Sequence, residues 1–176
     1  MKCQFWSMDA IFAMVIFGIA IVLVTFVWYN ISNQFALASG YGVEGMQAQL
    51  QGLQARLLSQ GTPPNWNNLI STGNTATWNN ISIGLGGEGQ GTLSTQKVMT
   101  LMAMSNYDYQ ATKPELGVGF DYYITIRGGA IDLRIGRSPE LKNAVSEQVS
   151  TVPVDIGGSQ AYMQVIVWTN TSFGVT

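Results

Sequence analysis

The sequence contains no histidine and only one cysteine, Cys3, among its 176 residues. Without histidine, the common serine and cysteine nucleophiles lack their usual base, and no G-x-S-x-G segment is present. A single cysteine can form neither an intramolecular disulfide nor a cysteine pair for zinc. These absences argue against an enzyme, and we expect no catalytic residues, no metal and no cofactor.

Charged residues are also scarce. Ten acidic and eight basic residues give a formal net charge of −2, and they form no clustered run. A surface that follows nucleic-acid phosphates needs a basic patch, so we expect no nucleic-acid partner. The polar surface must come from Asn, Gln, Ser, Thr and Gly, which suits a solvent-facing coat and packing between like subunits equally well.

One glycine-rich segment, Gly84 to Gly89, matches the G-x-G-x-x-G pattern of dinucleotide sites. That pattern binds a cofactor when a helix opens at the third glycine within a parallel βαβ unit. Here Gln90-Gly91-Thr92 follows, within an antiparallel pattern. We therefore expect a surface loop.

The chain does have one long apolar run, from Ala10 to Tyr29 (AIFAMVIFGIAIVLVTFVWY). About 20 helical residues span roughly 30 Å, the hydrocarbon thickness of a bilayer, so the run predicts a transmembrane helix. Aromatic side chains at Trp6 and Trp28 fit the two membrane interfaces, and Lys2 favours a cytoplasmic N-terminus. A secretory signal cleaved at Ala38 is the alternative, although signal h-regions are shorter, at about 7–15 residues.

A second helical pattern covers residues 43–60. It ends at Gly61, which is followed by Thr62-Pro63-Pro64. If the two segments join, one helix of about 50 residues runs to Gln60, and glycines predict a bend near residue 40. Its apolar stripe recurs at spacings of three and four and consists of Val43, Met46, Leu50, Leu53 and Leu57.

The remaining chain reads mainly as strands. Residues 120–127 and 131–135 alternate between apolar and polar side chains on either side of Gly128-Gly129, which predicts a β-hairpin. We expect weaker strands at 145–154 and 162–168, a short strand at 78–85, and a short helix that starts at Ser94 and ends near Ser105. The predicted fold class is α+β, with a long N-terminal helix packed on a mainly antiparallel sheet of about four strands.

The N-terminal residues Gln4-Phe5-Trp6-Ser7-Met8-Asp9 place a serine and a carboxylate two residues apart before the apolar run. This arrangement resembles archaeal type IV pilins and pilin-like proteins with a short class III signal peptide, although Phe5 stands where those proteins usually have glutamine. The resemblance implies cleavage between Gln4 and Phe5. It also implies a leader at 1–4, a helix at 5–60 and a β-rich head at 61–176.

The resemblance further implies a role for Asp9. Its carboxylate would pair with the new N-terminal amine of a neighbouring subunit and set the register between subunits, because an ionised group among apolar helices needs a partner. A simpler reading is that the helix dipole favours an acid at this end. The filament core would be formed by one set of helix residues, namely Ala10, Phe12, Ala13, Ile16, Phe17, Gly18, Ile21 and Val24.

These features predict a structural subunit of a cell-surface filament used for adhesion. Its partners would be copies of itself, the membrane before assembly, prepilin peptidase and the pilus assembly machinery. A minor pilin or pseudopilin of the same system shares every N-terminal feature. A monomeric binding protein held by a single membrane span is the other alternative, and it would need its own sheet to cover the whole stripe from Val43 to Leu57.

Three N-glycosylation sequons begin at Asn30, Asn80 and Asn170. Asn80 and Asn170 would be accessible in an exported domain, so they are the candidate modification sites. Asn30 lies too close to the predicted membrane span.

Overall fold

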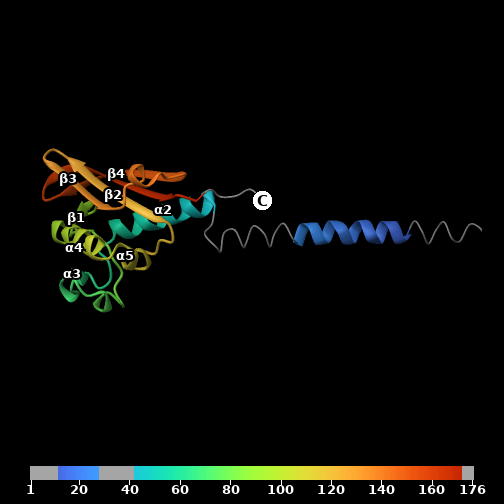
Figure 1. The fold of residues 1–176 in the computed structure, drawn as a ribbon, viewed down its shortest axis with the longest axis horizontal. Helices are drawn as coiled ribbons and strands as arrows, with labels where there is room; N and C mark the ends of the chain where they lie inside the picture. The colour runs from blue at the N-terminus through green and yellow to red at the C-terminus, as the bar shows by residue number, and fades with distance from the viewer. Residues whose placement is uncertain (1–11, 28–41, 172–176) are drawn as a thin grey trace, which may run out of the picture. The chain divides into compact units, whose positions relative to one another are not determined.

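The computed structural model describes residues 12–27 and 42–171. The chain divides into two compact units, Met1–Ser39 and Gly40–Thr176. In the first unit the described residues, 12–27, form one helix (Figure 1). The second unit contains all the strands of the described chain and is an α+β domain.

The predicted long N-terminal helix is wrong. The amphipathic segment forms a separate helix, α2 (Val43–Leu58), that belongs to the same unit as the sheet. Gly42, immediately before α2, has φ 122° and ψ 169°, a conformation that a right-handed helix cannot include. The backbone conformation of Gly42 therefore separates α2 from the preceding chain, although the apolar residues on either side predict one continuous helix. Within the described residues, no helix combines the length and apolarity needed to cross a membrane.

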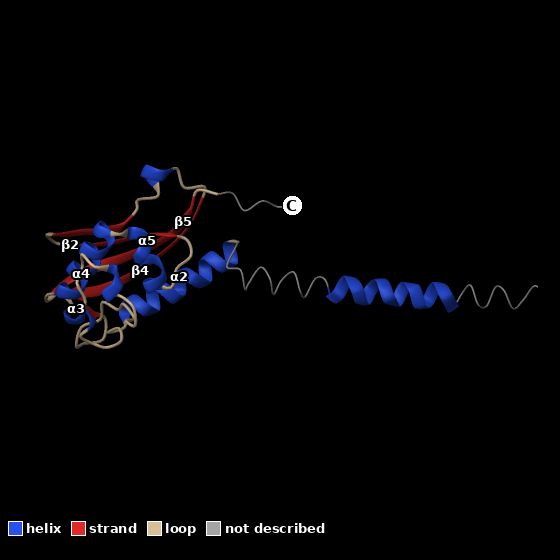
Figure 2. Cartoon of the chain, turned by 60° about the horizontal axis from the view of Figure 1, so that its bottom comes forward, coloured by secondary structure: helices blue, strands red, loops and turns tan. Residues whose placement is uncertain are grey.

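The predicted sheet is also corrected. Five strands lie in the order β1-β4-β5-β2-β3, and the sheet is mixed and curls strongly into a half-barrel (Figures 1 and 2). The edge strand β1 runs parallel to β4, whereas every other neighbouring pair is antiparallel. The expected type IV pilin-like arrangement is thus contradicted, and only the general α+β class remains. The strands are β1 (Thr92–Leu93), β2 (Asp121–Gly128), β3 (Ile131–Gly136), β4 (Ser146–Ile156) and β5 (Ser159–Thr169).

The hairpin predicted from alternation is confirmed, although Gly128 belongs to β2 and the turn residues are Gly129 and Ala130. The strands predicted at 145–154 and 162–168 are confirmed too, but their pairing with each other was not predicted. β2 and β3 form the expected hairpin, with Ile124 opposite Ile135 and Gly128 opposite Ile131. β4 and β5 form a second hairpin that closes at Ile156 and Ser159. The predicted strand at 78–85 is wrong, because only Ser82 of that segment makes a β-bridge, to Thr62.

The helices pack on one face of the sheet. α2 contacts β4 and β5, and α4 contacts β3 (Figure 1). The helix predicted from Ser94 is confirmed as α4, while α5 had no counterpart in the sequence prediction. The remaining helices are α3 (Trp66–Leu69), α4 (Thr95–Tyr107), α5 (Tyr109–Leu116), and two 3₁₀ turns, η1 (Thr75–Thr77) and η2 (Glu140–Lys142).

A continuous apolar core lies between this helical layer and the sheet. Four of the five stripe residues of α2 are at most 4 % exposed, whereas Val43 is 51 % exposed. Trp66 is fully buried and donates its indole N–H to the Gly84 carbonyl at 2.8 Å. The unit Gly40–Thr176, which we call the head from here on, therefore has a complete core of its own.

Candidate functional sites: an exposed apolar helix and a tyrosine network

The helix of residues 12–27, which we call the apolar helix, exposes all of its described side chains. The exposed fractions of its large apolar residues run from 49 % at Ile21 to 77 % at Met14. Its single hydroxyl, on Thr25, donates to the Ile21 carbonyl at 2.8 Å and so is satisfied within the helix. The surface of this helix is therefore almost purely apolar.

The predicted site residues fall into two groups. Phe12, Ala13, Ile16, Phe17, Gly18, Ile21 and Val24 lie on the apolar helix and are exposed. Apart from its chain neighbours and the backbone of its own helix, no atom lies within 4 Å of the position that a Gly18 side chain would occupy. The other predicted residues, Gln4, Phe5, Asp9 and Ala10, lie outside the described part of the chain.

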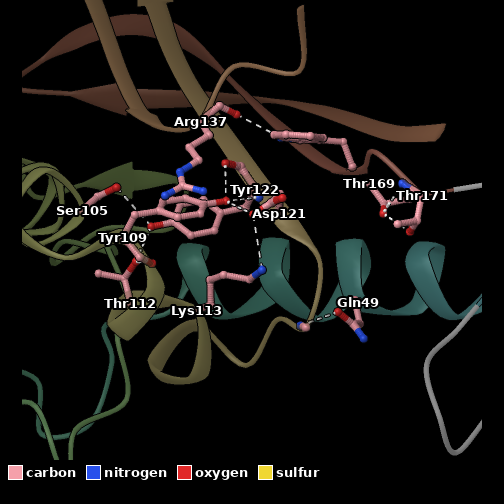
Figure 3. A network of polar contacts seen from close by, with 12 residues as sticks. Gln49, Ser105, Tyr109, Thr112, Lys113, Asp121, Tyr122, Arg137, Thr169 and Thr171 are labelled. Atoms are coloured by element: carbon pink, nitrogen blue, oxygen red, sulfur yellow. Dashed lines mark hydrogen bonds and ion pairs between the residues drawn. The ribbon is translucent and has the colours of Figure 1, made fainter. Parts of the chain in front are cut away.

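A second candidate site, which the sequence reasoning missed, is a cluster of polar and aromatic side chains between α5 and the start of β2 (Figure 3). The Tyr109 hydroxyl donates to Asp121 Oδ1 at 2.9 Å and accepts the backbone N–H of Tyr122 at 2.8 Å. The two tyrosine rings stack with their centroids 4.9 Å apart. We call this cluster the tyrosine network.

Two cations complete the tyrosine network. The Arg137 guanidinium lies 4.4 Å from the centre of the Tyr109 ring, a cation–π contact, and Lys113 Nζ lies 3.3 Å from Asp121 Oδ1. On the other side of the stack, the Tyr122 hydroxyl lies 2.6 Å from Thr112 Oγ1. The network therefore joins α5, β2 and the segment after β3.

The chemistry of the tyrosine network suits a structural role, in which hydrogen bonds and ring stacking hold neighbouring elements together. Burial raises the pKa of both Tyr109 and Tyr122, so their hydroxyls stay protonated near neutral pH. A protonated phenol can donate and accept hydrogen bonds but is not a base. Sequence reasoning missed the network because its members are spread over residues 109–137 and no local spacing links them.

Removing the Tyr109 hydroxyl tests this structural role. We expect Tyr109→Phe to lower the unfolding free energy by roughly 1–3 kcal/mol, because the buried Tyr122 N–H and the Asp121 carboxylate lose a partner. Urea denaturation measures the change. Tyr107→Phe is the matched control, since the Tyr107 side chain is 60 % exposed. Equal losses in both variants would contradict the structural role.

In the glycine-rich segment, Gly84 allows the chain to lie directly against the backbone of Ser59 and Gly61. A side chain at Gly84 would collide with the Gly61 nitrogen and the Ser59 carbonyl, at the end of α2. Lys97 crosses the same region and donates to the Gln60 and Gly86 carbonyls at 2.8 and 3.0 Å. Gly84 therefore packs against the chain that follows α2, and the Gly86 carbonyl accepts from a lysine. The expected surface loop is wrong for Gly84 to Gly86, which are buried.

The two candidate glycosylation sites, Asn80 and Asn170, are both exposed. Within the described residues, no group of three or more acidic or cysteine side chains is placed to hold a metal ion. Comparison of the chain with protein-family models, curated proteins and solved structures finds no match.

Proposed function

We propose that this chain is the structural subunit of an archaeal type IV pilus-like filament on the cell surface, assembled through the apolar helix and used for adhesion. The exposure of the apolar helix is the observation that carries the proposal. Side chains that are 49–77 % exposed along a whole helix form a large apolar surface, and such surfaces mark contacts with other apolar groups.

The composition of the apolar helix supports contact with copies of itself. Phenylalanine, isoleucine, leucine and valine occupy most of its positions, and burial of each such side chain contributes roughly 1.5–3 kcal/mol. Because the head already has its own core, it does not need this helix in order to fold. The helix is thus free to supply the cohesion between subunits, with the membrane as its apolar surroundings before assembly.

In this proposal Asp9 sets the register between subunits through the amine released at Phe5, with prepilin peptidase making the cut and the pilus machinery assembling the product. A minor pilin of the same filament would use the same groups.

One observation favours a second candidate, a monomeric binding protein that the apolar helix holds at a membrane. The sheet covers the α2 stripe at Met46, Leu50, Leu53 and Leu57, and only Val43 is left exposed. α2 therefore has little apolar surface left for neighbouring subunits, and the case for assembly depends on the apolar helix.

Shearing of native cells separates the two candidates. We expect peptide mass spectrometry to find the chain in high-mass filaments released by shear, with a mature end at Phe5. Recovery of the chain only as a monomer from detergent-extracted membranes would contradict assembly and support the anchored binding protein. An unsheared sample of the same cells is the control for protein released by lysis.

A further inference from the structure

The outer face of the sheet carries a hollow of about 310 Å³ near the turn between β4 and β5. Pro153 and Asp155 of β4 lie opposite Tyr162 and Gln160 of β5, and Gln90 borders the hollow from the loop before β1. The hollow is at the small end of ligand sites, which are roughly 300–1,000 Å³. It therefore suits a small group and not a long chain.

Tyr162 provides an aromatic platform at this hollow. Its side chain is 63 % exposed, although it is flanked by Pro153 on the paired strand. An exposed tyrosine ring offers a flat apolar face and a polar tip, which suits a ligand with both C–H and O–H groups.

The polar groups around Tyr162 supply both donors and acceptors. The Gln90 and Gln160 carboxamides are exposed and hydrogen-bond to no other residue in the described part of the chain. Each carboxamide has two N–H donors and one acceptor oxygen. The Asp155 carboxylate is held in place by the Gly158 N–H at 2.9 Å and keeps further acceptor capacity. Paired donors and acceptors of this kind match vicinal hydroxyl groups.

Within the described residues, the hollow offers no unpaired cation. The described side chains that line it include one charged group, Asp155, whose carboxylate already accepts a backbone N–H. Arg127, which lies opposite Tyr162 on β2, and Arg134 both contact the Asp132 carboxylate, at 3.3 and 2.7 Å, so both arginines are already paired. An anionic ligand would therefore meet a carboxylate in the hollow and, among the described side chains, no free positive charge.

We propose that this hollow, the Tyr162 hollow, binds a neutral sugar at the end of a glycan. The ring of Tyr162 stacks on the apolar face of the sugar, and Gln90, Gln160 and Asp155 bond its hydroxyls. The site lies wholly on the head, so it does not depend on filament assembly. Only its use in adhesion depends on the proposed function.

Saturation-transfer NMR tests the sugar site. The full chain, unassembled in polyoxyethylene detergent that carries no sugar headgroup, is mixed with the methyl glycosides of glucose, galactose, mannose and N-acetylglucosamine. We expect transfer to the ring C–H protons of at least one glycoside. We expect Tyr162→Ala to weaken its affinity by roughly tenfold, about the value of one aromatic contact, and Tyr162→Phe to retain it.

Tyr107→Ala is the matched control, because Tyr107 is similarly exposed, at 60 %, and lies on α4. Gln160→Ala is a second test that leaves the platform in place, and we expect it to weaken binding too. Transfer to none of the four glycosides, or equal losses in the Tyr162 and Tyr107 variants, would overturn the site. Binding confined to a sialylated or sulfated sugar, or to a peptide, would also overturn it. Because the NMR experiment uses the unassembled chain, its result can be interpreted even if the chain forms no filaments.

Discussion

We expect Ile16→Asp to abolish filament formation while the head stays folded. Ile16 is 67 % exposed on the apolar helix, so the change leaves the isolated chain little affected. In a filament the new carboxylate would be buried among apolar helices without a partner. An unpartnered buried charge costs roughly 3–5 kcal/mol at each contact, and the penalty recurs in every subunit. Electron microscopy of sheared material measures the loss.

Ile16→Leu is the matched control, because it keeps the volume and apolarity of the side chain. We expect it to assemble normally. Circular dichroism of each purified variant reports whether the head is intact. Filaments of Ile16→Asp at the yield of the unchanged chain would remove Ile16 from the subunit contact and weaken the proposed role of the whole apolar helix.

The second large expected effect is on the folding stability of the head. We expect Leu53→Ala to lower its unfolding free energy by roughly 2–5 kcal/mol, the usual loss when a buried leucine leaves a cavity. Leu53 is 1 % exposed on α2, the helix that packs on β4 and β5. Urea denaturation followed by tryptophan fluorescence measures this change, since Trp66 and Trp78 are buried in the same core.

Gln51→Ala is the control for Leu53→Ala, because Gln51 is exposed on the same helix. We expect a change within about 0.5 kcal/mol. If Leu53→Ala were equally mild, α2 would not be the helix that closes the core. The Ile16 and Leu53 variants together separate assembly from folding, since each is expected to affect one and spare the other.

Strong local patterns predicted the corresponding elements well. Alternation over 120–135 predicted the β2–β3 hairpin, and the spacing of three and four in α2 predicted which of its side chains are buried. Both patterns express one physical fact, that a strand or helix with one apolar face must turn that face to a core. Val43 is the exception, because it lies in the first turn of α2 beside Gly42.

Features built from distant residues were not predictable in the same way. β1 has only two residues, so it carries no alternation, and its parallel pairing to β4 brings Thr92 beside Asp155. α5 contains Pro114 and mainly polar residues, so its sequence shows no apolar helical period and predicted no helix. The tyrosine network and the Tyr162 hollow likewise depend on side chains that only the folded sheet brings together.

The sequence by itself determined that this chain has an apolar segment after residue 9, an amphipathic helix, one β-hairpin, two further strands and no histidine chemistry, because these follow from composition and local period. Tertiary structure alone decided how the strands are ordered, that β4 and β5 pair as a second hairpin, and which polar groups meet. The reason is that strand order and long-range contacts depend on how apolar faces are shared across the whole core, and no short window of sequence contains that information.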